Sequence, residues 1–312
     1  MHIYRGLEGL VRNDSTVISI GTFDGVHGAH RQILNKVLEL SKANNARSFI
    51  VTFDPHPQEV LKNKTPDIKL LTTTDEKIML FEKIGIENLL IINFTEEFSK
   101  TNARDFYKDI IYSKAGISHL VVGFDHVFGR NREGDFGTLQ GLGKEFGFEV
   151  HRVDEIDIEG IKVSSTKIRH FLDEGNVEMA NKLLGHEYGF EGRIVVGDKN
   201  GRKFGYPTAN VEPAASNKLI PGDGVYCVKV SVGNDEFYGM MNIGYRPTVS
   251  EGIKKIMEVN IFEFDKDIYG EKIYIWFLTR LRSEIKFNSI DELIKQLGKD
   301  KEESLKYLKS KK

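Results

Sequence analysis

The sequence has only one cysteine, and it has no long apolar run. A single thiol cannot form a disulfide within the chain, and Cys227 lies in the strand-like run 224–232, so we expect it to be a buried core residue. The charged residues Arg5, Arg12 and Asp14 interrupt the apolar core that a signal peptide needs. No stretch approaches the length that crosses a bilayer. We therefore expect a cytoplasmic protein without a membrane partner.

The chain also lacks a strong excess of charge of either sign. Its 44 Lys and Arg residues nearly balance 46 Asp and Glu residues, for a net charge of −2. Such a balance gives no overall attraction to nucleic acid or anionic lipid, so any cationic site has to be local. The chain is 40% apolar, as ordinary globular proteins are, and its 312 residues exceed the usual size of one domain. Two domains and no nucleic-acid partner are expected.

The densest motif of the first half is G-T-F-D-G-V-H-G-A-H at positions 21–30. Residues 17–20 before it predict a buried strand, and apolar residues on helical spacing follow it. The motif is therefore a strand-to-helix turn, where the free N–H groups of a helix N-terminus favour an anion. His27 and His30 share one side of the first helical turn, which suits a polyphosphate. The alternative is that His30 caps the helix and His27 is a polar loop residue.

Strands and helices alternate along the rest of the first half. Strands are expected from 47, at 88–93 and at 119–123, and helices at 74–84, 101–113 and 176–184. The first of these helices has Thr74 or Asp75 as its expected N-cap. Alternation of this kind predicts a parallel, doubly wound α/β sheet.

Three polar segments accompany these elements. D-P-H-P follows a strand end at 54–57, a cationic loop with glycines occupies 123–135, and S-S-T-K-I-R lies at 164–169. Ligands bind beyond the carboxyl ends of parallel strands, and the planar guanidinium of arginine suits phosphate oxygens. A structural turn, a solvated loop and a helix cap are the respective alternatives.

After residue 186 the pattern changes to short strands and tight turns, with one helix after about Ser289. Strands so short and numerous predict a closed all-β barrel with a terminal helix, because closure removes sheet edges. We expect one domain at 1–186 and a second at 187–312. Thr208 and Asn210 offer hard oxygen ligands on one face of an extended chain, as Mg²⁺ accepts. A hairpin turn followed by a strand start is the alternative for this segment.

These segments together resemble the bacterial bifunctional riboflavin kinase/FAD synthetases. In the first half, the motifs at 21–30, 51–57, 123–135 and 164–169 match the nucleotidyltransferase signatures, with Ala29 where the family usually has glycine. In the second half, G-D-K-N-G-R-K-F-G-Y-P-T-A-N at 197–210 matches the riboflavin kinase signature. The similarity continues through 221–226, 242–248 and 258–270, with Asn260 where the family often has histidine.

The resemblance implies that ATP phosphorylates riboflavin to FMN in the second domain, and that ATP then adenylylates FMN to FAD in the first. It implies Mg²⁺ as cofactor, held through Thr208 and Asn210. The implied catalytic residues are Glu258 as base, His27, His30 and Arg169. The implied ATP- and phosphate-binding residues are Gly21, Phe23, Asp24, Gly25, Asp125, Arg132, Ser164, Ser165, Thr166, Gly197, Gly201 and Gly205. The implied flavin-binding residues are Phe53, His56, Pro57, Tyr206 and Arg282.

Two other functions stay open at this point. The chain could be a riboflavin kinase whose first domain has decayed into a nucleotide-binding module, and Ala29 is the sequence support for it. It could also be a flavin-sensing protein without turnover, which a substituted Glu258, Asn210 or His27 would favour. None of these three residues is substituted.

Overall fold

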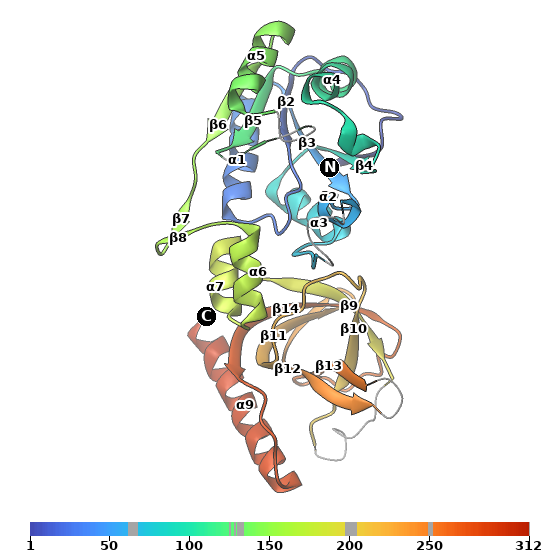
Figure 1. Ribbon diagram of the computed structural model, residues 1–312. Coiled ribbons are helices and arrows are strands. Elements are labelled where there is room, and N and C mark those ends of the chain that lie inside the picture. The colour runs from blue at the N-terminus through green and yellow to red at the C-terminus, as the bar shows by residue number, and fades with distance from the viewer. Residues whose placement is uncertain are drawn as a thin grey trace. The chain divides into compact units, whose positions relative to one another are not determined.

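The computed structural model describes residues 1–61, 68–124, 126–127, 129, 134–196, 205–248 and 252–311. The chain divides into two compact units, Met1–Ser165 and Thr166–Lys312. Figure 1 shows the elements of both units. The domain division between residues 186 and 187 that we expect from the sequence stays a prediction.

Six parallel strands form the sheet of the first unit, in the order β1-β4-β3-β2-β5-β6. Their bounds are β1 (His2–Arg5), β2 (Thr16–Ile20), β3 (Arg47–Asp54), β4 (Asn88–Asn93), β5 (His119–Gly123) and β6 (Glu149–Val153). All five residues of β2 are buried, as in parallel strands that are covered on both faces. The chain moves from β2 to β3 on one side and later places β5 on the other. The resulting switch point between β2 and β5 is where open α/β sheets bind ligands.

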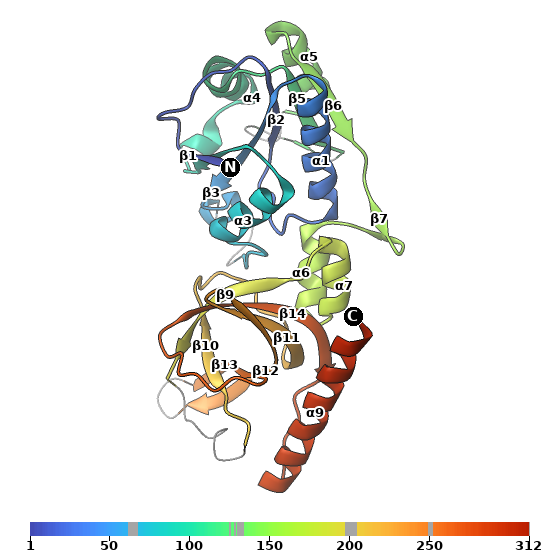
Figure 2. The same ribbon diagram turned by 180° about the vertical axis from the view of Figure 1, so that it is seen from behind.

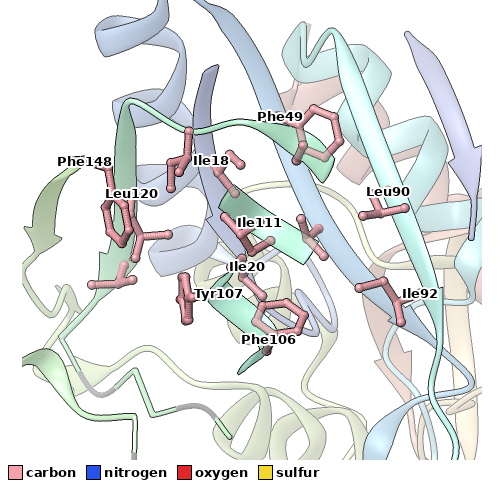
Figure 3. Close-up of a cluster of buried hydrophobic side chains, with 14 of the residues drawn as sticks. Ile18, Ile20, Phe49, Leu90, Ile92, Phe106, Tyr107, Ile111, Leu120 and Phe148 are labelled. Atoms are coloured by element: carbon pink, nitrogen blue, oxygen red, sulfur yellow. The ribbon is translucent and has the colours of Figure 1, made fainter. Parts of the chain in front are cut away.

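Helices cover both faces of this sheet. They are α1 (Gly28–Ala43), α2 (Pro57–Val60), α3 (Thr74–Ile84), α4 (Ala103–Asp105) with the π-helical continuation η2 (Phe106–Ala115), and α5 (Phe136–Phe146). On one face, Val37 of α1 and Phe81 of α3 belong to the same buried cluster as Ile50 of β3. On the other face, side chains from η2 pack against β2 and its neighbours, as Figure 3 shows for Phe106 and Ile20. The expected doubly wound sheet is confirmed.

The N-terminus of α3 differs by one residue from the expectation. The N-cap is Thr73, not Thr74 or Asp75: its hydroxyl accepts the N–H of Glu76 at 3.2 Å. The Glu76 carboxylate accepts the N–H of Thr73 at 2.9 Å in return, which completes a capping box. Gly85 ends the helix with a φ of 98°, a conformation that favours glycine.

The second unit is a closed six-stranded barrel in the order β10-β13-β12-β11-β14-β9, with antiparallel neighbours. The strands are β9 (Gly189–Val195), β10 (Ala209–Pro213), β11 (Gly224–Val232), β12 (Asp235–Thr248), β13 (Gly252–Ile261) and β14 (Lys272–Arg282). Phe190, Tyr226 and Phe277 are buried, and the ring centroids of Phe190 and Tyr226 lie 6.0 and 5.3 Å from that of Phe277. The expected closed all-β barrel is confirmed.

Helices complete the second unit. The terminal helix α9 (Ile290–Ser310), capped by Ser289, lies along the outside of the barrel (Figure 2). Two helices precede the barrel in the sequence, α6 (Ser165–Asp173) and α7 (Val177–Leu184). A short hairpin of the first unit comes before them and consists of β7 (Asp157–Ile158) and β8 (Ile161–Lys162). The Asn181 side chain fastens α7 to the barrel, because it donates to the carbonyl of Phe277 at 2.8 Å.

The one cysteine lies in β11 and is buried, which confirms the expected core thiol. Burial raises the pKa of the Cys227 thiol to about 11. Across the residues that the structure describes, the longest apolar helical stretch falls short of what a membrane span requires.

Candidate active sites

A cleft of about 230 Å³ lies where the sheet order reverses in the first unit. It is lined by the turn after β2, by the start of the loop after β5, and by the segment that follows β6. Its walls include His27, His30, Gly123, Ser164 and Ser165. Motifs far apart in the sequence therefore meet at one site, at the carboxyl ends of adjacent strands.

The two histidines of the motif form a stacked pair in this cleft. His27 is the N-cap of α1, and its Nδ1 atom accepts the N–H of His30 at 3.4 Å, so the cap is His27 and not His30. The two imidazole rings lie 3.6 Å apart between centroids and 13° from parallel. The Nδ1 atom of His30 is shielded from solvent and has no hydrogen-bond partner among the described residues.

The electrostatic environment keeps His30 neutral. Burial lowers the pKa of His30 well below its ordinary value, and the nearby His27 and Lys77 lower that pKa further. At neutral pH the ring therefore offers one donor and one acceptor, not a full positive charge. An anion bound beside the ring would raise this pKa, because opposite charge favours the protonated form.

Asp24 holds the turn that carries the histidines. Its carboxylate accepts the backbone N–H groups of Leu71 and Thr72 at 3.2 and 3.0 Å. The hydroxyl of Thr72 accepts the N–H of Gly25 at 2.9 Å. Asp24 and Gly25 thus fix the turn against the segment before α3, and their contact with ATP stays a prediction.

Phe23 and Gly21 shape the same turn from within. Phe23 is buried and meets the His30 ring edge-on at 5.2 Å. A Cβ atom at Gly21 would lie 3.2 Å from the Phe23 ring, which is tighter than an ordinary contact. Glycine therefore leaves room for the ring that backs His30. Direct binding of ATP by these two residues stays a prediction.

Lys77 is a buried cation that sequence analysis missed. It lies on α3 and is 4% exposed, and its Nζ atom donates to the carbonyl of Thr22 at 3.3 Å. Burial lowers the pKa of Lys77, against the opposite effect of three carboxylates, those of Asp24, Asp54 and Glu59. The available signal was its position four residues before the core residue Phe81, on the same face of the helix.

The serine motif reaches the cleft through two residues. The hydroxyl of Ser165 donates to the carbonyl of Asp24 at 3.0 Å, and Ser164 also lines the cleft. Thr166 is exposed and Arg169 is half-buried, and both lie on α6 within the second unit. Their approach to the cleft stays a prediction.

The segment expected to border the flavin forms a capped turn after β3. The Nδ1 atom of His56 accepts the N–H of Gln58 at 3.2 Å, and Pro57 opens α2. Phe53 is buried and packs edge-on against Phe94 at 5.7 Å. His56 therefore has the structural role in a turn that was the alternative for this segment. Flavin contact by Phe53, His56 and Pro57 stays a prediction. Asp125, Arg132, Gly197 and Gly201 lie outside the described residues.

The barrel brings the expected metal ligand and the expected base together. In the antiparallel pair β10 and β13, Asn210 lies opposite Glu258, and in the pair β12 and β13, Asn242 lies opposite Glu258. Residues opposite each other in neighbouring strands share one face. Asn210, Glu258 and Asn242 therefore form a row across three strands, and Thr208 precedes Asn210 by two residues.

Asn260, the departure from the family pattern, supports this row. Its buried side-chain amide donates to the carbonyl of Pro207 at 2.7 Å and so holds the segment that leads to Thr208. Gly205 is exposed with a φ of 78°, and Tyr206 packs on the apolar cluster that contains Phe262.

Arg282 is already engaged within the barrel unit. It donates to both carboxylate oxygens of Asp300, from Nε at 2.9 and 3.1 Å and from Nη2 at 2.8 Å. Asp300 lies on α9 and is fully buried, and Gln296 donates to it at 2.8 Å. The expected contact between Arg282 and flavin stays a prediction, and no short-range sequence signal indicates the ion pair.

Comparison with known proteins gives one family model for each half of the chain. The FAD synthetase model matches residues 11–167, and the riboflavin kinase model matches residues 184–308. A bifunctional riboflavin kinase/FMN adenylyltransferase from Buchnera aphidicola subsp. Schizaphis graminum is 38% identical over 98% of this chain and 99% of its own length. Proteins of the same name from Bacillus subtilis and Escherichia coli strain K12 are 36% and 35% identical, over 94% and 96% of this chain and 92% and 96% of their own.

A solved structure shares the complete architecture. A crystal structure described as a macrolide-efflux protein from Streptococcus pneumoniae has a TM-score of 0.88 with this chain at 30% identity. The match covers 97% of this chain and 98% of that one. The name of that protein describes a different activity from the one that the two family models describe.

Proposed function

The chain belongs to the family of bifunctional riboflavin kinase/FMN adenylyltransferases, and from this premise we propose which residues carry each reaction. As a member it phosphorylates riboflavin with ATP to FMN, and it transfers the adenylyl group of ATP to FMN to give FAD and pyrophosphate. The flavin and ATP are its substrates. The cytoplasmic location expected from the sequence stays a prediction.

We assign the kinase reaction to the row of polar side chains on the barrel. The Glu258 carboxylate accepts the proton of the riboflavin 5′-hydroxyl as that oxygen attacks the γ-phosphorus of ATP, and ADP leaves. The observation that carries this assignment is the strand register that sets Asn210 opposite Glu258. The amide oxygen of Asn210 and the hydroxyl of Thr208 are hard donors that fit Mg²⁺. When bound, Mg²⁺ would neutralise charge on the phosphates of ATP.

We assign the adenylyl transfer to the cleft between β2 and β5. The attacking phosphate of FMN is already anionic, so the site needs no protein nucleophile and no strong base. The neutral imidazole of His30 lines the cleft in the first turn of α1, and a helix N-terminus favours phosphate oxygens. The hydroxyls of Ser164 and Ser165 line the same cleft. These groups would act by positioning and by stabilising charge on the leaving pyrophosphate.

Arg169 and Thr166 complete the assignment as a proposal that rests on the family motif. Arginine holds phosphate oxygens through its planar fork, and a hydroxyl near a helix N-terminus can donate to the same anion. Their contribution can be separated from that of the histidines, because they lie on a different element, α6.

Two variants test whether the reactions use separate sites. Glu258→Gln should stop FMN formation from riboflavin and leave FAD formation from supplied FMN intact. His30→Gln should do the reverse. Glu212→Gln, at an exposed position on β10, and His2→Gln, at an exposed position on β1, are matched controls that should keep both activities. The assignment is wrong if either test variant loses both activities while it stays folded.

Metal removal tests the role of Thr208 and Asn210. Chelation of divalent metal should stop FMN formation, and added Mg²⁺ should restore it. Asn210→Leu should need a higher Mg²⁺ concentration for the same rate of FMN formation, because it removes a hard oxygen ligand. An unchanged Mg²⁺ dependence in Asn210→Leu would remove this residue from the proposed site.

A further inference from the structure

A second group of metal-ligating side chains lies away from the cleft, on strands β5 and β6. His119 is the first residue of β5, and Glu149 is the first residue of the edge strand β6. The two strands are parallel, with His119 opposite Glu149 and Val121 opposite His151. The group therefore lies toward the amino ends of β5 and β6, whereas the residues that line the cleft lie at or follow the carboxyl ends of β2, β5 and β6.

The strand register places all three side chains on one face of the sheet. Residues two apart in a strand point to the same side, so Glu149 and His151 share a face with His119. Val121 on the same face belongs to the core cluster that α1 covers. The charged groups of α1 that face His151 are Lys36 and Glu39, which pair with each other at 2.7 Å.

Three potential ligand atoms converge at this position. Nδ1 of His119 lies 3.1 Å from Nε2 of His151, and Oε2 of Glu149 lies 3.7 and 3.6 Å from these two nitrogens. A point inside this triangle is about 2.0 Å from all three atoms, which is the usual length of Zn–N and Zn–O bonds. A hydrogen bond between the two rings would explain the first distance alone. It leaves unexplained a carboxylate oxygen that is too far for a hydrogen bond to either nitrogen and nearly equidistant from both.

We propose that His119, Glu149 and His151 form a three-ligand site for a divalent transition-metal ion, with Zn²⁺ as the best match. Two imidazoles and one carboxylate suit Zn²⁺, whereas Mg²⁺ prefers oxygen ligands alone. The imidazoles are 13% and 26% exposed and the glutamate side chain is 74% exposed, so an ion can enter from solvent and keep a water as its fourth ligand.

The proposed ion would link the edge strand β6 to β5. Glu149 and His151 come from one strand and His119 from the other, so coordination adds a cross-link beside the backbone hydrogen bonds of the pair. A ligand that binds only the folded chain raises its stability by mass action. The expected role is therefore stabilisation of the sheet edge, independent of the two transfer reactions.

Metal titration of the full chain tests the site. Chelator-treated protein without nucleotide should bind one Zn²⁺ per chain in competition with a chromophoric chelator. Co²⁺ in its place should give the visible absorption bands of a tetrahedral site with nitrogen ligands. Zn²⁺ should also raise the unfolding temperature of the first unit, followed by circular dichroism.

Ligand variants identify where the ion binds. His119→Gln and His151→Gln should each weaken Zn²⁺ binding by about 100-fold or more, since even partners behind a ligand contribute about 10–100-fold. Glu149→Gln, at a largely exposed side chain, should weaken binding by about tenfold and keeps the test valid if a histidine variant fails to fold. The matched control is His170→Gln, because His170 pairs with Glu174 at 3.5 Å on an exposed helix face, and among the described residues no third metal-ligating group joins them. It should bind Zn²⁺ as the parent chain does.

Two results would overturn the proposal. Zn²⁺ binding that survives His151→Gln but disappears in His30→Gln would assign the ion to the histidine pair of the cleft. Absence of stoichiometric Zn²⁺ and Co²⁺ binding would show that the two imidazoles make a hydrogen bond and nothing more.

Discussion

The buried ion pair between Arg282 and Asp300 should decide the stability of the barrel unit. Four hydrogen bonds end on the Asp300 carboxylate, which is fully buried, while the Arg282 side chain is 15% exposed. Asp300→Asn leaves the guanidinium without its counter-charge. Removing one partner of a buried pair costs about 3–5 kcal/mol, and because asparagine keeps one acceptor oxygen we expect a loss of about 3 kcal/mol.

Tryptophan fluorescence measures this loss in the barrel alone, because Trp276 on β14 is the only tryptophan in the sequence. Urea unfolding followed by this signal reports the second unit even if the two units unfold separately. The control is Lys272→Gln, which breaks an exposed ion pair with Glu191 at 2.9 Å and should cost less than about 1 kcal/mol. A loss in Asp300→Asn no larger than in this control would refute the reasoning.

Three further predictions concern other parts of the chain. Burial holds the pKa of His30 below its ordinary value, and the nearby His27 and Lys77 lower that pKa further. The stability that comes from the neutral ring is therefore present above about pH 6.5, and it is lost as the pH falls toward the folded-state pKa. As the pH falls from about 7.5 to about 5.5, the His30→Gln variant should therefore lose less stability than the parent chain. Urea unfolding followed by circular dichroism measures this, and an equal loss of stability in both proteins would contradict it. Asn260→Leu removes the donor to the Pro207 carbonyl and should raise the KM for ATP in FMN formation by about tenfold. Asn260→His should restore much of the affinity, and equal KM values in the two variants would contradict the prediction. Lys77→Met should lower the rate of FAD formation by about tenfold or more and leave FMN formation unchanged, because small displacements of catalytic groups slow a reaction strongly. Chromatography of both products measures this, and an unchanged rate of FAD formation would contradict it.

Some elements were predictable to the residue because they are continuous apolar runs between polar ends. The strands at 88–93 and 119–123 are such cases. The helix at 74–84 was predicted from its helical spacing instead, and its N-cap is Thr73 and not Thr74 or Asp75. The helix α5 was missed because three glycines lower its local helix propensity. Packing explains one of them: a Cβ at Gly143 would lie 2.6 Å from the carbonyl oxygen of Phe148. Tertiary contact therefore overrides propensity here.

The edge strand β6 was missed for a related reason. Its sequence, E-V-H-R-V, has charged or polar residues at 149, 151 and 152, and its side chains are exposed or only partly buried. A half-exposed strand of five residues gives a much weaker periodic signal than a buried one. The proposed zinc ligands on β6 were consequently outside every motif that the sequence indicated.

The candidate sites were partly predictable because motifs at strand ends converge by topology. His27, His30, Ser164 and Ser165 line one cleft, as parallel strand ends predict. The role of Asp300 was not predictable, because it depends on which face of a charged helix packs against the barrel. For Lys77 the only signal was its helical spacing from Phe81. In the sequence, Asp300 lies in a lysine- and glutamate-rich helix that indicates a solvated face.

Product chromatography of the purified chain with riboflavin, ATP and Mg²⁺ tests the bifunctional assignment most directly. We expect FMN to accumulate first and FAD to follow, with pyrophosphate released in proportion to FAD. FMN without FAD, even when FMN is supplied directly, would contradict the assignment of the β2–β5 cleft. Tight flavin binding without any product would contradict both assignments.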